Sequence, residues 1–234
     1  MKKYIFILIQ VIFLFHFGKA QNEIGISTGV VNSIYDFRAA FDENFDKEWA
    51  GIGYQGNIFF KKPLWQSNFS MIPNISYTYQ RQNMFIQENK KFGSAKWTEK
   101  INTMGLDVLF RYQFPAKFIS PYFEFGSSWI FNLNGVASKS IPDSSYQTPS
   151  VTIEFGKSTN DTYKSTVFGW TLGAGLNAEF DFGNLGLGIR YFGAPDIINH
   201  KLKRYGLVTI NDDNKIKLRN LMLSLSYSLP LGGY

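Results

Sequence analysis

The chain contains, from Val167 to Asp181, the stretch VFGWTLGAGLNAEFD. Its even positions, Phe168 to Phe180, are all apolar, and its odd positions, Gly169 to Asp181, are all small or polar. A period of two places the two sets on opposite faces of a β-strand. This stretch therefore predicts one strand with an apolar face and a polar face.

Seven other stretches alternate in the same way, so the sequence predicts eight strands. They cover about Glu23–Ile34, Trp49–Lys61, Asn68–Met84, Ile101–Phe114, Ser120–Leu133, Leu185–Phe192 and Lys217–Leu231. Two shorter strand-like pieces, Ser150–Phe155 and Gly206–Ile210, are predicted to be hairpin extensions above the barrel, and a ten-strand barrel is the competing count. Pro73 and Pro121 cannot donate ladder hydrogen bonds, so bulges or strand ends are expected there.

The links between these strands alternate in length. They are brief after the second, fourth and sixth strands and longer and polar after the others. Short periplasmic turns and long extracellular loops are typical of outer-membrane barrels. The fold class is therefore predicted to be all-β, an eight-stranded antiparallel up-and-down transmembrane barrel, and the even strand count puts both termini in the periplasm.

The N-terminus resembles a secretory signal peptide. A basic start at Met1–Lys3 precedes the apolar run Tyr4–Phe17 and the small residues of Gly18-Lys19-Ala20, which predicts cleavage after Ala20. The alternative is an uncleaved membrane helix, but the run is shorter than the roughly 20 residues that a spanning helix needs. With no cysteine present for lipid attachment, residues 21–234 are expected to form one barrel domain, with no separate periplasmic domain.

The alternation and the signal peptide together predict that the apolar faces point outward into the bacterial outer membrane. Outer-membrane lipids are then the first expected partner. The predicted apolar belt comprises Met104, Leu106, Val108, Phe110, Phe125, Leu172, Leu176, Leu187, Leu223 and Leu225. Its predicted aromatic girdles are Tyr77, Tyr79, Trp129, Trp170 and Tyr191 on the outer side and Phe60, Phe69, Tyr112, Phe180 and Tyr227 on the periplasmic side.

Charged residues on the inward faces are the main candidate site. Asp107, Arg111, Glu124, Glu179 and Arg190 all have lumenal parity, and most fall in the periplasmic half of their strands. Short turns bring Arg111 near Glu124 and place Arg190 on the strand beside that of Glu179. Buried charges need partners, so we expect a salt-bridged lumen; an ion pathway or gate is the alternative.

The sequence offers no catalytic, cofactor or metal site. After cleavage the only histidine is His200, which has no hydrolase motif around it and is interpreted as a solvated loop residue. Three Gly-X-Gly stretches lie inside alternating strands, which argues against a nucleotide site, and Asp212 and Asp213 lack the spacing of a calcium loop. The net charge of +6, which falls to +3 without Lys2, Lys3 and Lys19, gives no support for a nucleic-acid partner.

The C-terminal third resembles a known group. Arg190-Tyr191, Asp196–Asn199, Ile216–Asn220 and Leu223–Tyr227 are similar to the closing hairpin of the small porin-family, PorT-like outer-membrane barrels of Bacteroidota-type bacteria. Pro121–Gly126 and Gly173–Leu176 resemble the fifth and sixth strands of that family. The resemblance implies an outer-membrane location and an eight-stranded barrel, and one branch of the family serves a protein secretion system.

These observations leave several function hypotheses. The first is a non-enzymatic structural or interaction protein that acts through its extracellular loops, with a lumen filled by side chains. A narrow porin-like channel or small-ligand carrier is the second, and an accessory subunit of an outer-membrane secretion system is the third; either of the protein-binding roles would bring protein partners. A lipid-modifying enzyme is disfavoured because no catalytic set is visible.

Overall fold

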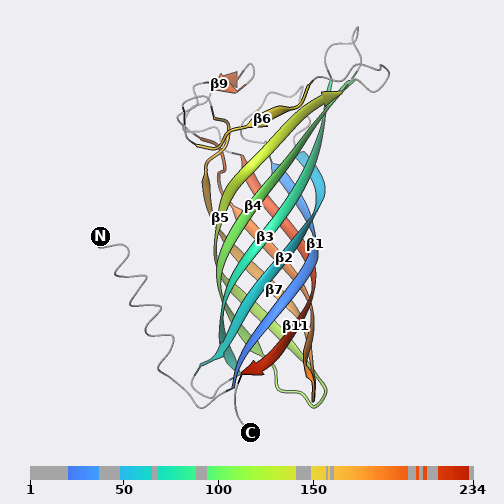
Figure 1. Cartoon of the computed structure of the whole chain (residues 1–234), viewed down its shortest axis with the longest axis vertical. Coiled ribbons are helices and arrows are strands. Elements are labelled where there is room, and N and C mark those ends of the chain that lie inside the picture. Colours follow the sequence, from blue (N-terminus) through green and yellow to red (C-terminus); the bar gives the residue numbers. More distant parts are fainter. Residues whose placement is uncertain are drawn as a thin grey trace, which may run out of the picture.

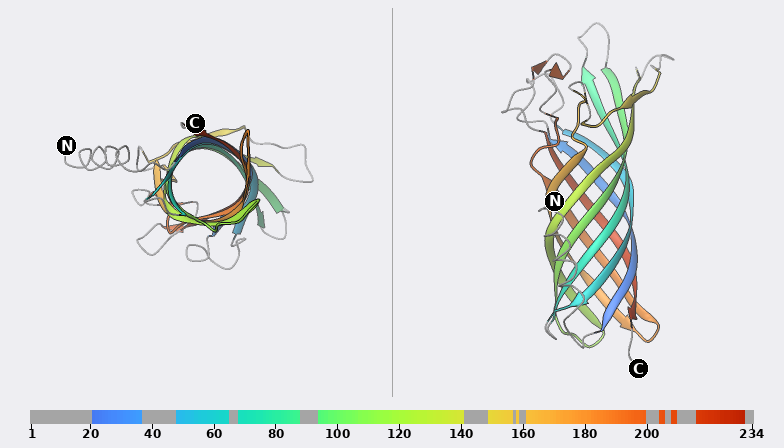
Figure 2. Two further views of the ribbon diagram at one scale, coloured as in Figure 1. Left: turned by 90° about the horizontal axis from the view of Figure 1, so that it is seen from below. Right: turned by 60° about the vertical axis from the view of Figure 1, so that its left-hand side comes forward.

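The computed structural model describes residues 21–36, 48–64, 68–87, 94–140, 149–156, 158, 161–199, 204–205, 208–209 and 216–231. The predicted signal peptide, His200, Asp212 and Asp213 lie outside these residues. Within them, eight long antiparallel strands close into a ring (Figures 1 and 2). The ring strands are β1 (Asn22–Asp36), β2 (Glu48–Pro63), β3 (Phe69–Gln87), β4 (Ser94–Gln113), β5 (Ile119–Ser140), β7 (Thr166–Phe180), β8 (Gly183–Ala194) and β11 (Lys217–Leu231).

Each ring strand pairs with its neighbours in the chain, and β1 pairs with β11 to close the barrel. The ten-strand alternative is wrong. The piece predicted at Ser150–Phe155 contains β6 (Val151–Ile153), which pairs with the upper part of β5. β9 (Arg204–Tyr205) and β10 (Val208–Thr209) pair with each other in a separate small sheet.

The two ends of the barrel differ as the link lengths predicted. Residues 64–68, 114–118 and 181–182 connect strands at what we call the short-turn end, where β1 also begins and β11 ends. The strand ends that the other links join lie at the opposite end of the barrel, which we call the long-loop end (Figure 1). The tightest turn leads into Gly183, whose φ of 134° is a conformation that L side chains rarely adopt.

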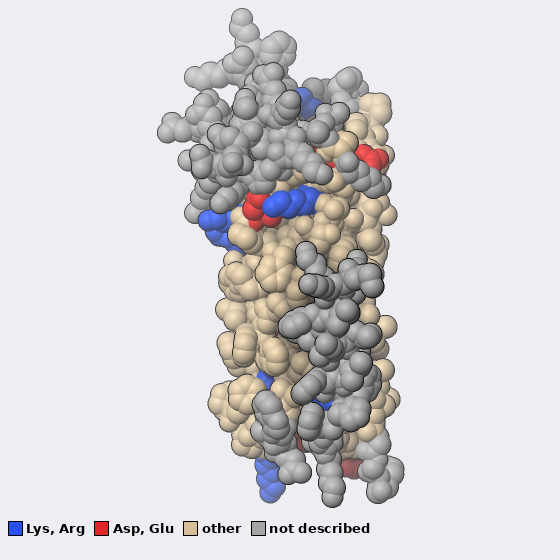
Figure 3. All heavy atoms as spheres, turned by 90° about the vertical axis from the view of Figure 1, so that its left-hand side faces the viewer, with Lys and Arg blue, Asp and Glu red and all other residues tan. Residues whose placement is uncertain are grey.

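The burial pattern is the reverse of that in a soluble sheet. On β7, for example, the outward Phe168 is 57% exposed, whereas the inward Thr171 is 6% exposed. Eight of the ten predicted belt residues are exposed and the other two, Val108 and Phe110, are half-buried. Figure 3 shows one face of this belt, with charged residues above it and near its lower end. A closed ring that pairs its backbone internally and exposes apolar side chains is suited to lipid.

Aromatic side chains lie at both borders of the belt. Trp170 and Tyr191 are in ring contact at 5.2 Å near the long-loop border, and Phe69 and Tyr112 at 5.0 Å near the short-turn border. This arrangement agrees with the predicted girdles. No helix among the described residues is long and apolar enough to cross a membrane.

Several strands exceed their predicted bounds by one to three residues, and two extend seven residues further than predicted. β4 begins at Ser94 and β5 continues to Ser140, with a register shift at Asn102/Thr103. Above Asn102 the outward residues are mostly polar, with Val136 as an apolar exception, so the alternation fades in the sequence although the ladder continues beyond the belt. The β2–β3 pairing is interrupted between the rows Phe59–Asn74 and Lys62–Met71, the stretch that contains Pro73.

Candidate functional site

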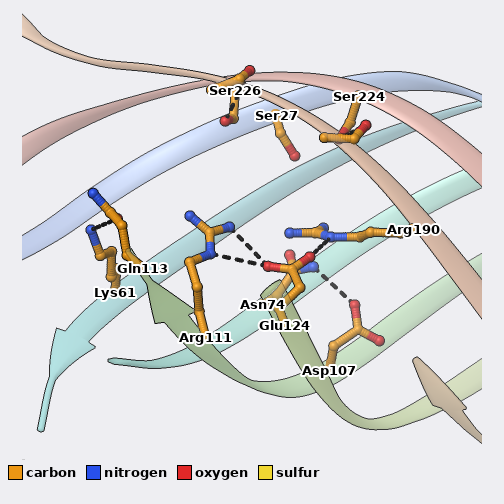
Figure 4. A network of polar contacts seen from close by, with 12 residues as sticks. Ser27, Lys61, Asn74, Asp107, Arg111, Gln113, Glu124, Arg190, Ser224 and Ser226 are labelled. Carbon is orange, nitrogen blue, oxygen red and sulfur yellow. Dashed lines mark hydrogen bonds and ion pairs between the residues drawn. The ribbon is translucent and has the colours of Figure 1, made fainter. Parts of the chain in front are cut away.

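Three buried charges meet inside the barrel. Arg111 on β4 lies directly opposite Glu124 on β5, and its Nη2 and Nε donate to Glu124 Oε2 at 2.9 and 3.1 Å. Arg190 on β8 forms an ion pair with the other oxygen, Glu124 Oε1, through its Nε (Figure 4). We call these three residues the central triad. Glu124 is 0% exposed, so its charge is balanced by protein groups and not by solvent.

Further polar and aromatic side chains surround the central triad. Asp107 lies on β4 and accepts a hydrogen bond at its Oδ2 from Asn74 Nδ2 at 2.9 Å. Asp107 lies opposite Ser128, four residues along β4 from Arg111, and Figure 4 shows it near Asn74 and the central triad. The Arg111 guanidinium also stacks 3.8 Å from the centre of the Tyr122 ring, a favourable cation–π geometry.

Glu179 belongs to a different layer. Arg190 does lie on the strand beside it, but Arg190 is level with Gly173, whereas Glu179 is level with Asn184 near the turn. Glu179 is exposed and accepts a hydrogen bond from Gln113 Nε2 at 3.2 Å. The structure thus brings together Arg111, Glu124 and Arg190, sets Asp107 beside them, and separates Glu179 from the group.

The short-turn end has its own polar network, which the sequence reading missed. Lys61 Nζ donates to Glu23 Oε1 at 2.7 Å and to Gln113 Oε1 at 3.4 Å. Ser228 Oγ donates to the other Glu23 oxygen at 2.7 Å. Together with Glu179, these residues form the short-turn network, which links β11, β1, β2, β4 and β7 across the lumen. Glu23 and Lys61 have the same inward parity as the predicted charges, and this parity was the signal available.

A small cavity lies in the lumen and has Arg190 and Asp107 in its wall. Its volume is about 50 Å³. At roughly 10–15 Å³ per water-sized probe position, it has room for a few waters. Its lining is mainly polar and includes Ser76, Thr78, Thr103, Ser128, Thr171 and Asn220, with Phe192 and Met222 among the apolar members. A ligand pocket usually measures 300–1,000 Å³, so this cavity is far too small for an organic ligand.

The long-loop end of the lumen is filled by an apolar cluster, which we call the plug. Its members come from the inward faces of the strand ends and from the segments 155–163 and 197–198. They are Tyr35, Ile101, Phe155, Tyr163, Val167, Phe192, Ala194, Ile197, Ile198, Ile216 and Leu218. Backbone hydrogen bonds from Lys164 N to Ile197 O (2.9 Å) and from Asn199 N to Thr162 O (3.0 Å) join the two loop segments.

One carboxylate is buried beside the plug. Glu99 lies on β4 beyond the apolar belt and is 4% exposed. Its Oε1 accepts from Trp97 Nε1 at 3.0 Å and its Oε2 from Tyr163 Oη at 2.9 Å. Burial raises the pKa of Glu99 to about 7, against the lowering effect of these two donors. Tyr163 therefore connects the loop segment to a titratable group on the barrel wall.

The plug and Glu99 were not foreseen because their members come from segments without a regular period. Tyr163, Ile197 and Ile198 lie in long links for which no inward-facing core was predicted, and Phe155 ends a piece that was predicted only as a hairpin extension above the barrel. Among the described residues, no group of three or more His, Cys, Asp or Glu side chains could hold a metal ion. His200, which was interpreted as a solvated loop residue, lies outside the described residues.

Comparison with solved structures finds barrels of similar design. Neisserial surface protein A matches with a TM-score of 0.44 at 10% identity, over 87% of this chain and 96% of that one. The attachment invasion locus protein Ail of Yersinia pestis matches with a TM-score of 0.39 at 16% identity, over 90% and 100%. The outer membrane enzyme PagL matches with a TM-score of 0.39 at 17% identity, over 89% and 99%.

No curated protein sequence matches the chain. The family described as "Outer membrane protein beta-barrel domain" matches residues 16–231, which include all eight ring strands and both lumenal networks. A match of this extent assigns the family without help from the distant structural likenesses. The chain belongs to the outer membrane protein beta-barrel domain family.

Proposed function

We propose that this protein is a non-enzymatic barrel of the bacterial outer membrane that acts as a structural or interaction protein through its extracellular loops. In this proposal residues 1–20 are a signal peptide cleaved after Ala20, the long-loop end faces outward and the short-turn end faces the periplasm. The family assignment and the asymmetry of the links support this orientation. The resemblance to PorT-like barrels supports it as well.

The observation that carries the proposal is that side-chain contacts cross the lumen at successive levels, which supports a closed lumen. The short-turn network, the central triad and the plug each join side chains from different strands across the interior. Eight strands leave an interior only about wide enough for side chains. A closed lumen leaves the loops and the outer wall as the surfaces with which other molecules can interact.

Conductance in a planar lipid bilayer tests the closed lumen. The purified wild-type barrel is expected to give no steady current under conditions in which an open porin, inserted in the same bilayer, gives clear steps. Steady, large conductance from the wild-type protein would overturn the closed-lumen proposal in favour of a narrow channel. The cavity of about 50 Å³ is too small to favour a ligand carrier.

Orientation is tested separately with single cysteines, because the chain contains none. Val151, 62% exposed, lies at the long-loop end, and Phe118, 75% exposed, lies at the short-turn end. A membrane-impermeant maleimide should label Val151→Cys in intact cells and should label Phe118→Cys only after the cells are broken. The reverse pattern would refute the proposed orientation.

The same two positions distinguish the interaction role from the alternative of an accessory secretion subunit. A photo-crosslinking residue at Val151 should capture partners of the extracellular loops, whereas one at Phe118 should capture periplasmic components. Specific cross-links to a secretion component at Phe118 alone would favour the secretion role. Specific cross-links to another protein at Val151, with none at Phe118, would favour the loop-mediated role.

A further inference from the structure

Two cations lie side by side on the outer wall of the barrel. Arg81 on β3 and Lys100 on β4 are direct partners in the antiparallel register, and both side chains are exposed on the outward face. Directly opposed side chains in such a pair have Cβ atoms about 4.5–5.5 Å apart, and like charges at that distance repel. The pair therefore favours an anion between or above its two side chains.

No carboxylate occupies the neighbouring outward positions. The adjacent rows are neutral on all four strands around the pair, and neither cation has an ion-pair partner among the described residues. These neighbours are Ile52 on β2, Tyr79 and Asn83 on β3, Thr98 and Asn102 on β4, and Asn134, Val136 and Ser138 on β5. The nearby Glu99 has inward parity and is bonded to Trp97 and Tyr163.

Other cations near the long-loop border have an acidic residue beside them. Arg219 Nη2 lies 2.7 Å from Asp36 Oδ2, and Lys164 Nζ lies 2.6 Å from Asp196 Oδ2. Lys217 is the register partner of Asp36. An acidic residue thus lies close to each of these cations, but among the described residues no outward acidic side chain lies next to Arg81 and Lys100.

The height of the pair along the barrel indicates which anion it would meet. Tyr79 lies one outward position below Arg81, and Tyr77, two positions below, donates from its hydroxyl to Asn102 Oδ1 at 2.8 Å. This tyrosine level is the border of the apolar belt, so Arg81 and Lys100 lie where lipid headgroups begin. Arginine binds phosphate in a bidentate fashion and lysine adds a point charge.

We infer that Arg81 and Lys100 bind a phosphate group of the phosphorylated glycolipid in the outer leaflet, a lipid A headgroup. This inference rests on the proposed outward orientation of the long-loop end. The acyl chains of the same lipid would lie against the apolar wall of β3 and β4 below the pair, including Ile75 and Leu106, which are 56% and 39% exposed. The site would anchor the barrel at a fixed depth and attach one lipid molecule to this face.

The test uses the purified full-length barrel in neutral detergent and counts bound lipid by native mass spectrometry. Bisphosphorylated lipid A is compared with dephosphorylated lipid A and with inorganic phosphate alone. The wild-type protein should prefer the bisphosphorylated lipid by at least tenfold and should bind inorganic phosphate weakly. The double variant Arg81→Gln/Lys100→Gln should lose that preference, and Arg81→Lys should retain part of it.

Lys217→Gln is the matched control, because it removes one exposed cation at the same border but beside Asp36. It should bind lipid A like the wild-type protein. Equal binding of phosphorylated and dephosphorylated lipid by the wild-type barrel, or unchanged preference in the double variant, would refute the site. If the double variant does not fold, the two single glutamine variants and the wild-type phosphate dependence decide the question.

The lipid site and the proposed function can be refuted separately. A wild-type barrel that shows no preference for phosphorylated lipid and no conductance would refute the lipid site and leave the closed lumen intact. Steady conductance with an intact preference would refute the closed lumen and leave the lipid site. Maleimide labelling of Val151→Cys only in broken cells would refute the orientation on which the lipid A assignment depends.

Discussion

Arg190 reaches across β7 to form an ion pair with Glu124, two strands away in the barrel wall. The crossing is possible because the β7 residue level with Arg190 is Gly173, which places no side chain between them. A Cβ at Gly173 would lie 2.8 Å from Glu124 Cγ and Oε1 and 3.1 Å from Arg190 Cγ. The absence of a side chain at Gly173 thus allows Glu124 of β5 and Arg190 of β8 to meet across β7.

The first prediction concerns the charge of Glu124. Glu124→Gln leaves Arg111 and Arg190 buried without their shared carboxylate, which should cost about 3–5 kcal/mol of unfolding free energy. Arg111→Gln should cost less, because Arg190 still balances Glu124. Urea unfolding of the barrel in detergent measures both. The double variant Arg111→Gln/Glu124→Gln should recover part of the loss, since fewer charges remain unmatched.

The control for this prediction is Glu179→Gln. Glu179 is an inward carboxylate of the same sequence pattern but is exposed at the short-turn end. Its neutralisation should change stability by less than about 1 kcal/mol. Equal losses for Glu124→Gln and Glu179→Gln would contradict the assignment of a buried central triad.

The second prediction concerns Gly173. Gly173→Ala should destabilise the barrel by about 1–3 kcal/mol, because the added methyl group displaces both partners of a buried ion pair. Gly56→Ala is the matched control, since a Cβ there meets nothing within 4 Å. Urea unfolding should therefore separate the two variants, and similar midpoints would show that the Glu124–Arg190 contact tolerates the displacement.

The sequence predicted the parts of this site that depend on local geometry. Strand parity identified the inward charges, and the short link after β4 placed Arg111 near Glu124. The partner of Arg190 could not be obtained in this way. It depends on the registers of β5 with β7 and of β7 with β8, which place Glu124 and Arg190 on either side of Gly173. Strand parity alone does not give these two registers.

The plug illustrates a second limit of sequence reasoning. Residues such as Tyr163 and Ile198 become a core only when two long links fold back onto the strand ends. No periodicity marks such residues, because loop backbones have no fixed repeat. The upper parts of β4 and β5 were missed for a related reason: their outward faces lie beyond the belt and are polar, so they lack the alternation that identified the other strands.

The third prediction compares the cost of an arginine at two depths of the apolar belt. Leu225 is 58% exposed on the outward face of β11, six residues before Leu231 at the short-turn end. Leu225→Arg should lower the stability of the barrel in lipid vesicles by about 2–4 kcal/mol, as expected near the membrane midplane. Leu231→Arg should cost only about 0–1 kcal/mol at the interface. Equal costs at the two positions would argue against a membrane-spanning belt at this depth.

The last prediction concerns pH and the plug. Because burial raises the pKa of Glu99 to about 7 from the ordinary 4.5, the folded protein binds a proton more tightly than the unfolded chain. The stabilisation is therefore complete below about pH 4.5 and is lost as pH rises to about 7, a change on the order of 3 kcal/mol.

The groups that face Glu99 are Trp97 on β4, Tyr163 in the loop segment and Tyr35 on β1. The protection of the Lys164 and Asn199 amides against hydrogen exchange, relative to the intrinsic rate at each pH, should fall across this range, because these amides join the plug segments. Glu99→Gln should abolish the pH dependence, whereas Glu154→Gln, which alters an exposed carboxylate of the same loop region, should preserve it. Amide protection that stays constant between pH 4.5 and 7 in the wild-type protein would show that Glu99 does not control the plug.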